Sequence, residues 1–160
     1  MGEFSTAGLL ILMTLMFIGA SPGSTGGGIK TTTFFALLQG IKSAATGKQG
    51  KAFRGAMPKD AFRKASVITL LALGIIMAGT FCMTILEPQL SLQDILFEMV
   101  SAYGTVGLST GITHELGIGS KVLSILIMYT GRVGPITVVS LWYYQESKSG
   151  KLPEGDITIG

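Results

Sequence analysis

Three long stretches of this chain carry almost no charge. Residues 4–29 and 65–86 contain no Asp, Glu, Lys or Arg, and residues 122–145 contain only Arg132. Each stretch is longer than the roughly 20 residues that cross a bilayer core as a helix. The chain is 48% hydrophobic and 13% charged, with a mean hydropathy of +0.56, which is far from the composition of a soluble domain. We therefore predict an all-α integral membrane protein with three apolar passes.

The basic residues are concentrated in the connection between the first two apolar stretches. That connection holds the single acid Asp60, whereas residues 87–115 hold only acidic charges. The positive-inside rule therefore predicts a cytoplasmic basic connection and a cytoplasmic C-terminus in a multi-pass protein of the cell membrane. We expect no nucleic-acid binding, because apolar stretches flank the basic residues directly and no aromatic platform lies near them; contact with lipid headgroups is a generic alternative. The basic residues are Lys42, Lys48, Lys51, Arg54, Lys59, Arg63 and Lys64.

Residues 92–103 form an apolar segment that is too short for a full pass and includes Asp94 and Glu98. Ser91 and Asp94 have the spacing of a capping box, so we predict a re-entrant half-helix that begins there. The tripeptide TVG follows it, inside the Gly-rich residues 104–110. Backbone carbonyls of an extended loop of this kind can replace the hydration shell of K⁺. We predict a potassium filter; a chance TVG in an extracellular turn is the alternative.

A glycine-rich break interrupts the first apolar stretch. Residues 19–33 read GASPGSTGGGIKTTT, and their five glycines and one proline would break any helix. A phosphate-binding P-loop is disfavoured, because Ile29 separates Gly28 from Lys30 and no short strand precedes the loop. We predict a broken membrane helix whose freed backbone amides and hydroxyls line a cavity. For Lys30, anchoring of the cytoplasmic half-helix and a part in gating are equal alternatives.

Three motifs in order, GASPGSTGGGIKTTT, SAYGTVGLSTGIT and MYTGRVGPITV, resemble the superfamily of potassium transporters that includes Trk, Ktr and plant HKT proteins. The short loops and the ending GDITIG are most similar to the bacterial KtrB-type membrane subunits. By this resemblance, a family member would contain four repeats of membrane helix, pore helix and membrane helix (M-P-M), arranged around one pore. The resemblance implies a broken helix ending repeat three at residues 1–46, a basic connection at 47–62, repeat four at 63–146 and a cytoplasmic tail at 147–160.

The resemblance also implies roles for individual residues. Gly107 would be the filter glycine, with carbonyls of Thr105, Val106 and Leu108 beside it. A loop under the filter would act as the gate, and Arg132 matches the basic residue of the last helix that faces it. The gate loop would consist of Ser21, Pro22, Gly23, Ser24, Thr25, Gly26, Gly27 and Gly28.

Arg132 lies near mid-bilayer depth, about eleven residues into the last apolar stretch at 1.5 Å per residue. A lone charge at that depth must face protein or a water-filled path. It could tie down the carbonyl ends of neighbouring helices in a purely structural role. We favour the other interpretation, an electrostatic barrier below the filter that acts with the gate loop. Gly131, Gly134 and Pro135 flank Arg132 and predict a bend in this helix.

Two classes of function fit the sequence. The first is the pore-forming part of a potassium uptake transporter gated by the Gly-rich loop, and the second is a non-conducting membrane-embedded interaction subunit. A TVG tripeptide after a pore helix favours the pore. Leu108 and Ser109 depart from the TVGYG of dedicated K⁺ channels, which predicts a looser filter and some Na⁺ coupling or leakage. The chain has no Ser/His/Asp set and no metal-ligand spacing, so we expect neither an enzyme nor a cofactor.

The chain contains one filter segment, whereas a family member needs four. We expect either a fragment, with Met1 at a truncation point and a native C-terminus, or a chain whose missing repeats come from other chains. By the resemblance, the full-length subunit would be a homodimer. Its cytoplasmic face would meet a soluble nucleotide-binding regulatory ring.

Overall fold

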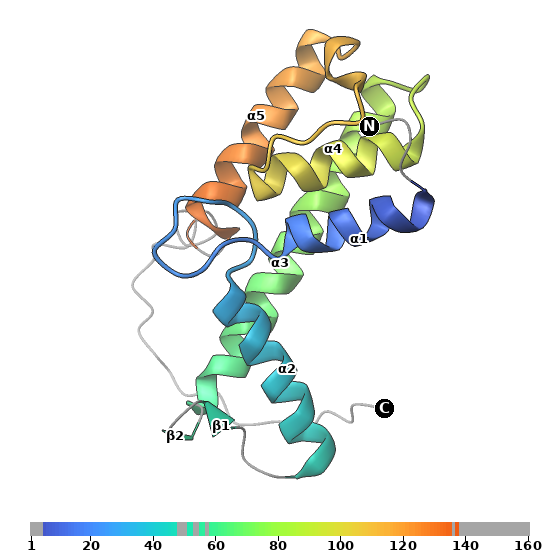
Figure 1. Cartoon of the computed structure of the whole chain (residues 1–160). Helices are drawn as coiled ribbons and strands as arrows, with labels where there is room; N and C mark the ends of the chain where they lie inside the picture. Colours follow the sequence, from blue (N-terminus) through green and yellow to red (C-terminus); the bar gives the residue numbers. More distant parts are fainter. Residues whose placement is uncertain (1–4, 48–50, 53–54, 57, 136, 138–160) are drawn as a thin grey trace, which may run out of the picture.

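The computed structural model describes residues 5–47, 51–52, 55–56, 58–135 and 137. This part of the chain is mostly helical, as expected of an all-α membrane protein (Figure 1). Two strands of two residues each, β1 (Lys51–Ala52) and β2 (Gly55–Ala56), pair antiparallel within the basic connection and were not predicted. The helices are α1 (Thr6–Phe17), α2 (Thr31–Thr46), α3 (Lys59–Leu86), α4 (Leu92–Gly104) and α5 (Ile118–Val133), with a 3-10 turn at Ile112–His114.

Helix α4 is the central element of the fold. It packs against α1, α3 and α5, and every residue of its last six is buried. Phe97, Met99 and Tyr103 are fully buried, in a core that also takes in Met83 of α3 and Ile127 of α5. The core therefore surrounds the C-terminal half of α4, and the predicted filter segment starts where that half ends.

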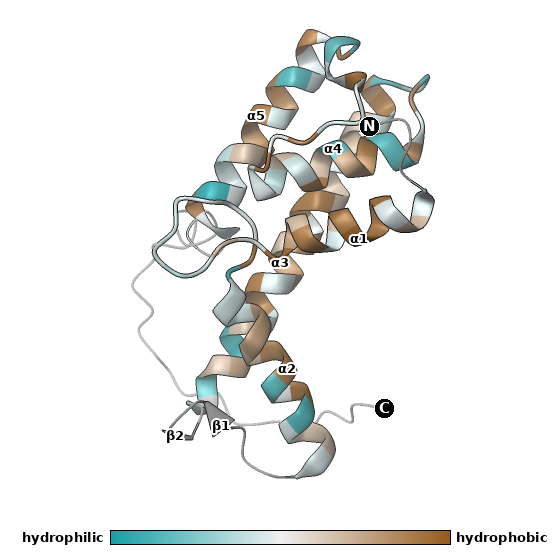
Figure 2. Ribbon diagram, viewed as in Figure 1, coloured by the Kyte–Doolittle hydropathy of each residue, from teal (hydrophilic) through white to brown (hydrophobic). Residues whose placement is uncertain are grey.

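The long helix α3 carries the clearest membrane character. Among the described helices it alone is long and apolar enough to cross a membrane, over Asp60–Leu86. Leu70 and Phe81 are 68% and 67% exposed, and Figure 2 shows apolar residues along α3 and α1. Exposed apolar surface of this extent is typical of a membrane or partner interface. The helix begins at Lys59, before the apolar stretch that starts at residue 65, because polar residues continue the same helix.

Glycines interrupt helix in both the first and the last apolar stretch. In the first stretch α1 ends at Phe17, and α2 begins at Thr31. In the last stretch, residues 122–145, α5 ends at Val133 because Gly134 has a φ of 94°. Helix is thus interrupted at Gly134, where the bend was predicted, and Pro135 and Thr137 beyond it are again helical. Residues 138–144 and the predicted tail, 147–160, lie outside the described part of the chain.

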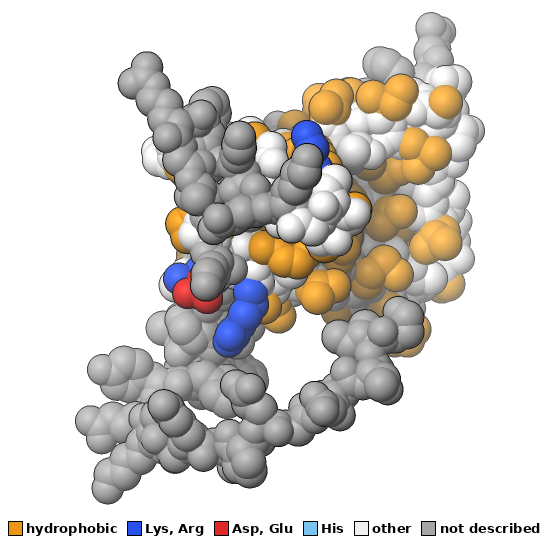
Figure 3. Space-filling view, turned by 90° about the horizontal axis from the view of Figure 1, so that it is seen from below, with side chains coloured by type: hydrophobic (Ala, Val, Ile, Leu, Met, Phe, Trp, Pro, Cys, Tyr) orange, Lys and Arg blue, Asp and Glu red, His pale blue; other side chains and the backbone are white. Residues whose placement is uncertain are grey.

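The end of the molecule at which α2 and α3 meet carries basic side chains. Figure 3 views the molecule from below and shows Lys and Arg side chains there, beside apolar surface. The two helices cross closely because Gly40 of α2 lies against the ring of Phe62, where a Cβ would overlap the ring. Helix α2 thus packs on the N-terminal half of α3, away from α4.

Candidate functional site

Helix α4 begins at the predicted cap. The Ser91 hydroxyl accepts a hydrogen bond from the Asp94 amide at 3.2 Å and lies 2.6 Å from the Asp94 carboxylate, to which it donates. The capping box was expected to send the acidic side chain back to the Ser91 amide, but here that carboxylate pairs with the serine hydroxyl. The helix is still capped, and it ends at Gly104, one residue beyond the predicted end.

The predicted filter segment leaves α4 through two backbone hydrogen bonds. The Thr105 amide donates to the Ala102 carbonyl and the Val106 amide donates to the Ser101 carbonyl, both at 3.0 Å. Thr105 has a φ of 51°, which is uncommon for a residue other than glycine, and Gly107 has a φ of 81°. A Cβ at Gly107 would meet no atom within 4 Å, so glycine is required there by the backbone angle and not by space.

The predicted gate loop is closed at its base by backbone pairing. The Gly19 amide donates to the Ile29 carbonyl at 2.8 Å, and the Ile29 amide donates to the Phe17 carbonyl at 3.1 Å. The Lys30 ammonium donates to the carbonyls of Gly26 at 2.7 Å and Ser24 at 3.2 Å. Lys30 therefore holds the far side of the loop, where residues 21–25 are exposed.

The gate loop and the filter segment are in direct contact. The Gly27 amide donates to the Thr105 hydroxyl at 2.9 Å, and the Gly28 amide donates to the Tyr103 carbonyl at 3.3 Å. A Cβ on Gly27 would lie 2.6 Å from the Tyr103 carbonyl oxygen, so no other residue fits without a shift. A groove of about 390 Å³ opens beside this contact, lined by α1, the loop, residues 104–106 and Leu108. The structure therefore brings both predicted motifs to one place.

The Tyr103 carbonyl is also where α5 meets α4. A Cβ on Gly131 would overlap this carbonyl, and one on Gly104 would lie 2.6 Å from the Met16 carbonyl oxygen of α1. Glycines from the loop, α4 and α5 thus allow three segments, α1, the loop and α5, to close around the end of the predicted pore helix. Arg132 follows Gly131 directly, but its side chain is exposed and has no hydrogen bond or ion pair within the described ranges.

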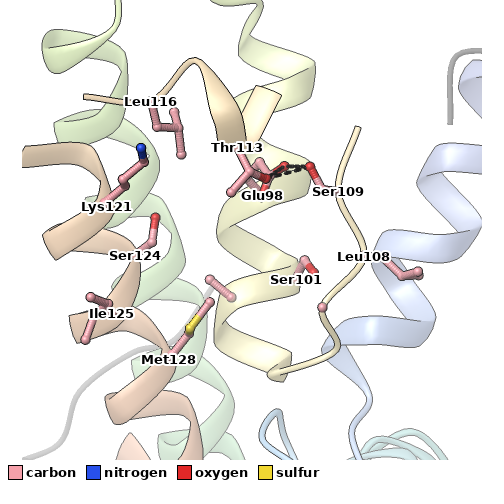
Figure 4. A pocket seen from close by; sticks show the side chains of 12 residues that line it. Glu98, Ser101, Leu108, Ser109, Thr113, Leu116, Lys121, Ser124, Ile125 and Met128 are labelled. Carbon is pink, nitrogen blue, oxygen red and sulfur yellow. Dashed lines mark hydrogen bonds between the residues drawn. The ribbon is translucent and has the colours of Figure 1, made fainter. Parts of the chain in front are cut away.

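A carboxylate on α4 binds the segment that follows the predicted filter. One Glu98 oxygen accepts hydrogen bonds from the hydroxyls of Ser109 and Thr113, the latter at 3.1 Å (Figure 4). The Ser109 hydroxyl also accepts from the Gly111 amide at 2.9 Å. We did not predict this cluster from the sequence. Its signal is a carboxylate on an otherwise apolar half-helix, followed by Ser and Thr just beyond the TVG tripeptide.

A second carboxylate, Glu87, joins the end of α3 to the start of α5 and was also not predicted as a site residue. It is 7% exposed and accepts hydrogen bonds from the Gly117 amide and the Ser120 hydroxyl, both at 2.7 Å, and from the Gln89 amide group at 2.8 Å. The Ser120 hydroxyl, with help from the Gly117 amide and Gln89, holds the pKa of Glu87 below its usual value of 4.5. This contact fixes two helices that pack on α4.

The chain aligns with known proteins over almost its whole length. The chain is 37% identical to the Ktr system potassium uptake protein B and 39% identical to the Ktr system potassium uptake protein D, both of Bacillus subtilis. These matches cover 99% of this chain and 36% and 35% of the relatives. It is 36% identical to the potassium/sodium uptake protein NtpJ of Enterococcus hirae, over 99% of this chain and 37% of that protein.

The chain thus spans about a third of the length of the curated relatives it matches. The TrkH family model, described as a cation transport protein, matches residues 1–150. The family resemblance predicted from the three sequence motifs is confirmed by this match. The chain belongs to the TrkH family of cation transport proteins.

Proposed function

We propose that this chain is part of the pore of a potassium uptake transporter, and that K⁺ passes along the backbone carbonyls of Thr105, Val106, Gly107 and Leu108. Two relatives are named as potassium uptake proteins and one as a potassium/sodium uptake protein. The positive φ angles of Thr105 and Gly107 support a filter role, because they let successive carbonyls turn away from helical directions. Some Na⁺ coupling is part of this proposal.

The observation that carries the proposal is the hydrogen bond between the Gly27 amide and the Thr105 hydroxyl at 2.9 Å. A Gly-rich loop bound to the first residue of a filter is well positioned to obstruct the path just inside it. Residues 21–28 would then be the gate, with Lys30 holding the loop closed. Arg132 would add a positive barrier, since its neighbour Gly131 packs on the same Tyr103 carbonyl to which Gly28 donates.

We also propose a membrane orientation for the chain and partners for the full-length subunit. The basic connection between α2 and α3 would face the cytoplasm, which places Glu87 and the segment after the filter outside. The full-length subunit would be a homodimer whose cytoplasmic face meets a nucleotide-binding regulatory ring. The C-terminal residues 157–160 would reach across the dimer, so removing them should lower the mass measured by light scattering at high dilution. An unchanged mass would remove the tail from the dimer contact.

Replacement of Gly107 tests the pore directly. Gly107→Asp in the intact transporter should abolish potassium-dependent growth of a transport-deficient strain, because a side chain strains the backbone at a φ of 81° and its charge disturbs the carbonyl ring. Gly47→Asp is the matched control, since Gly47 also has a positive φ, of 65°, and open space around its Cβ position, but caps α2 far from the filter. Normal K⁺ uptake and K⁺/Na⁺ discrimination with Gly107→Asp would refute the filter and favour a non-conducting interaction subunit.

A further inference from the structure

Residues 107–110, the outer half of the Gly-rich residues 104–110, have few restraints of their own. The inner half is bonded to α4 through the Thr105 and Val106 amides and to the loop through the Thr105 hydroxyl. By contrast, the amides of residues 107–110 donate no hydrogen bond within the described chain. A cavity of about 360 Å³ lies behind residues 107–109, between α4 and α5 (Figure 4). Packing from this side therefore does not hold the backbone of Gly107.

Two contacts limit the movement of this outer half. Leu108, which lines both this cavity and the groove beside α1, is partly buried and packs against the core. The Ser109 hydroxyl is bound by Glu98, which belongs to the central and largely buried helix α4. Because α4 is fixed on three sides by other helices, Glu98 is a rigid point against which the segment after the filter can be held. Thr113 binds the same carboxylate oxygen at 3.1 Å and extends this attachment to the 3-10 turn.

We propose that Glu98 is a positioning residue of the filter, whose hydrogen bonds to Ser109 and Thr113 fix the outer end of residues 105–108. This inference rests on the proposed function of those residues. Selectivity between K⁺ and Na⁺ depends on the arrangement of the coordinating carbonyls. With its outer end released, the segment could adjust its carbonyls to the smaller Na⁺, and the preference for K⁺ would fall.

The negative charge of Glu98 is a different explanation for any effect of its replacement on K⁺/Na⁺ preference, since a carboxylate near a pore mouth attracts cations. Four variants separate position from charge. Glu98→Ala removes both the acceptor and the charge, whereas Glu98→Gln keeps an acceptor and removes the charge. Ser109→Ala removes the bound hydroxyl and keeps the charge. Glu115→Ala is the matched control, because Glu115 is an exposed acid in the same loop whose side chain has no hydrogen bond in the described residues.

The measurement is K⁺ and Na⁺ uptake by the purified intact transporter in liposomes. We expect Ser109→Ala to lower the K⁺/Na⁺ uptake ratio about tenfold, the effect of losing one hydrogen bond to a charged acceptor. Glu98→Ala should lower the ratio by at least as much, because it also releases Thr113. Glu98→Gln should lower it by less than about threefold, because an amide oxygen still accepts, and Glu115→Ala should leave it unchanged. The double variant Glu98→Ala with Ser109→Ala should be no worse than Glu98→Ala alone, since Glu98→Ala already removes the bond between the two residues.

Two results would overturn the proposal. The first is an equal loss with Glu98→Gln and Glu98→Ala while Ser109→Ala stays at wild type, which assigns the effect to charge. The second is an unchanged ratio in both Glu98→Ala and Ser109→Ala. If Glu98→Ala does not reach the membrane, Ser109→Ala and Thr113→Val decide the matter. Gly107→Asp in the same liposomes keeps the two proposals apart, because unchanged uptake there refutes the filter itself.

Discussion

A single methyl group at Gly27 tests the contact between the gate loop and the filter segment. In Gly27→Ala the new Cβ would lie 2.6 Å from the Tyr103 carbonyl oxygen and 3.1 Å from that of Gly104. Relief of this overlap costs about 1–3 kcal/mol, the usual range for overpacking. The shift also weakens the hydrogen bond to Thr105, which is worth about 0.5–1.5 kcal/mol. We therefore expect the docked position of the loop to lose about 2 kcal/mol or more.

A loss of about 2 kcal/mol raises the undocked fraction of the loop roughly thirtyfold while that fraction is small. If the docked loop obstructs the path, K⁺ flux in Gly27→Ala should rise and depend less on the regulatory ring. The assay is K⁺ flux through purified protein in liposomes, with and without the ring. The thermal unfolding midpoint of the same preparation shows whether the fold itself is intact.

Gly26→Ala is the control for this experiment. A Cβ on Gly26 would have Ala20 Cβ at 3.2 Å and Ser24 Oγ at 3.7 Å as its nearest neighbours, and it would not touch the filter segment. We expect Gly26→Ala to behave like the wild type. Equal flux in the two variants would refute the idea that docking on Tyr103 restrains the loop. A fall in both flux and unfolding midpoint with Gly27→Ala would show that the contact supports the fold and is not a gate.

Substitutions at Gly131, Glu87 and Arg132 give three further tests. Gly131→Ala should lower the unfolding midpoint in spite of the better helix propensity of Ala, because its Cβ would overlap the Tyr103 carbonyl. The control is Gly119→Ala, whose Cβ would have Leu86 methyls at 3.8 Å as its nearest neighbours. A higher midpoint for Gly131→Ala would contradict the contact. Because the pKa of Glu87 is lowered from 4.5, its contribution to stability is complete above that pH and is lost as the pH falls through the folded-state pKa. The unfolding midpoint of the wild type should then fall faster below about pH 4.5 than that of Glu87→Gln, and parallel curves would disprove this. Arg132→Ala should raise K⁺ flux without lowering the unfolding midpoint, because the side chain is exposed and has no described partner; unchanged flux would exclude the barrier role.

Local chemistry made the positions of the breaks and caps predictable. Five glycines and Pro22 interrupt an apolar stretch, and the structure has no helix between Phe17 and Thr31. Ser91 begins α4 because its hydroxyl can accept from the Asp94 amide, a bond between near neighbours in sequence. These features depend on residues within one or two turns, so pattern and residue type are sufficient to predict them.

The hydrogen-bond partners of the site residues could not be predicted in the same way. The Gly27 amide finds Thr105 at a separation of 78 residues, and Glu87 finds Ser120 at a separation of 33. Such pairs form only when helices pack, and the sequence shows neither the crossing point nor the side chain that lies there. The glycine pattern predicted a permissive backbone, whereas the structure adds that Gly27 and Gly131 are required for close approach to one carbonyl.

The hydrogen bond between Gly27 and Thr105 has a thermodynamic consequence for the proposed gate. If release of the loop changes the affinity of the filter for K⁺, then bound K⁺ must change release of the loop by the same factor, because coupling between two sites is reciprocal. The transported ion would then act as an effector of its own passage. External K⁺ at the filter and the proposed regulatory ring on the other side of the membrane would both shift the equilibrium between docked and released loop. The response to external K⁺ would then depend on the ring, and the response to the ring would depend on external K⁺.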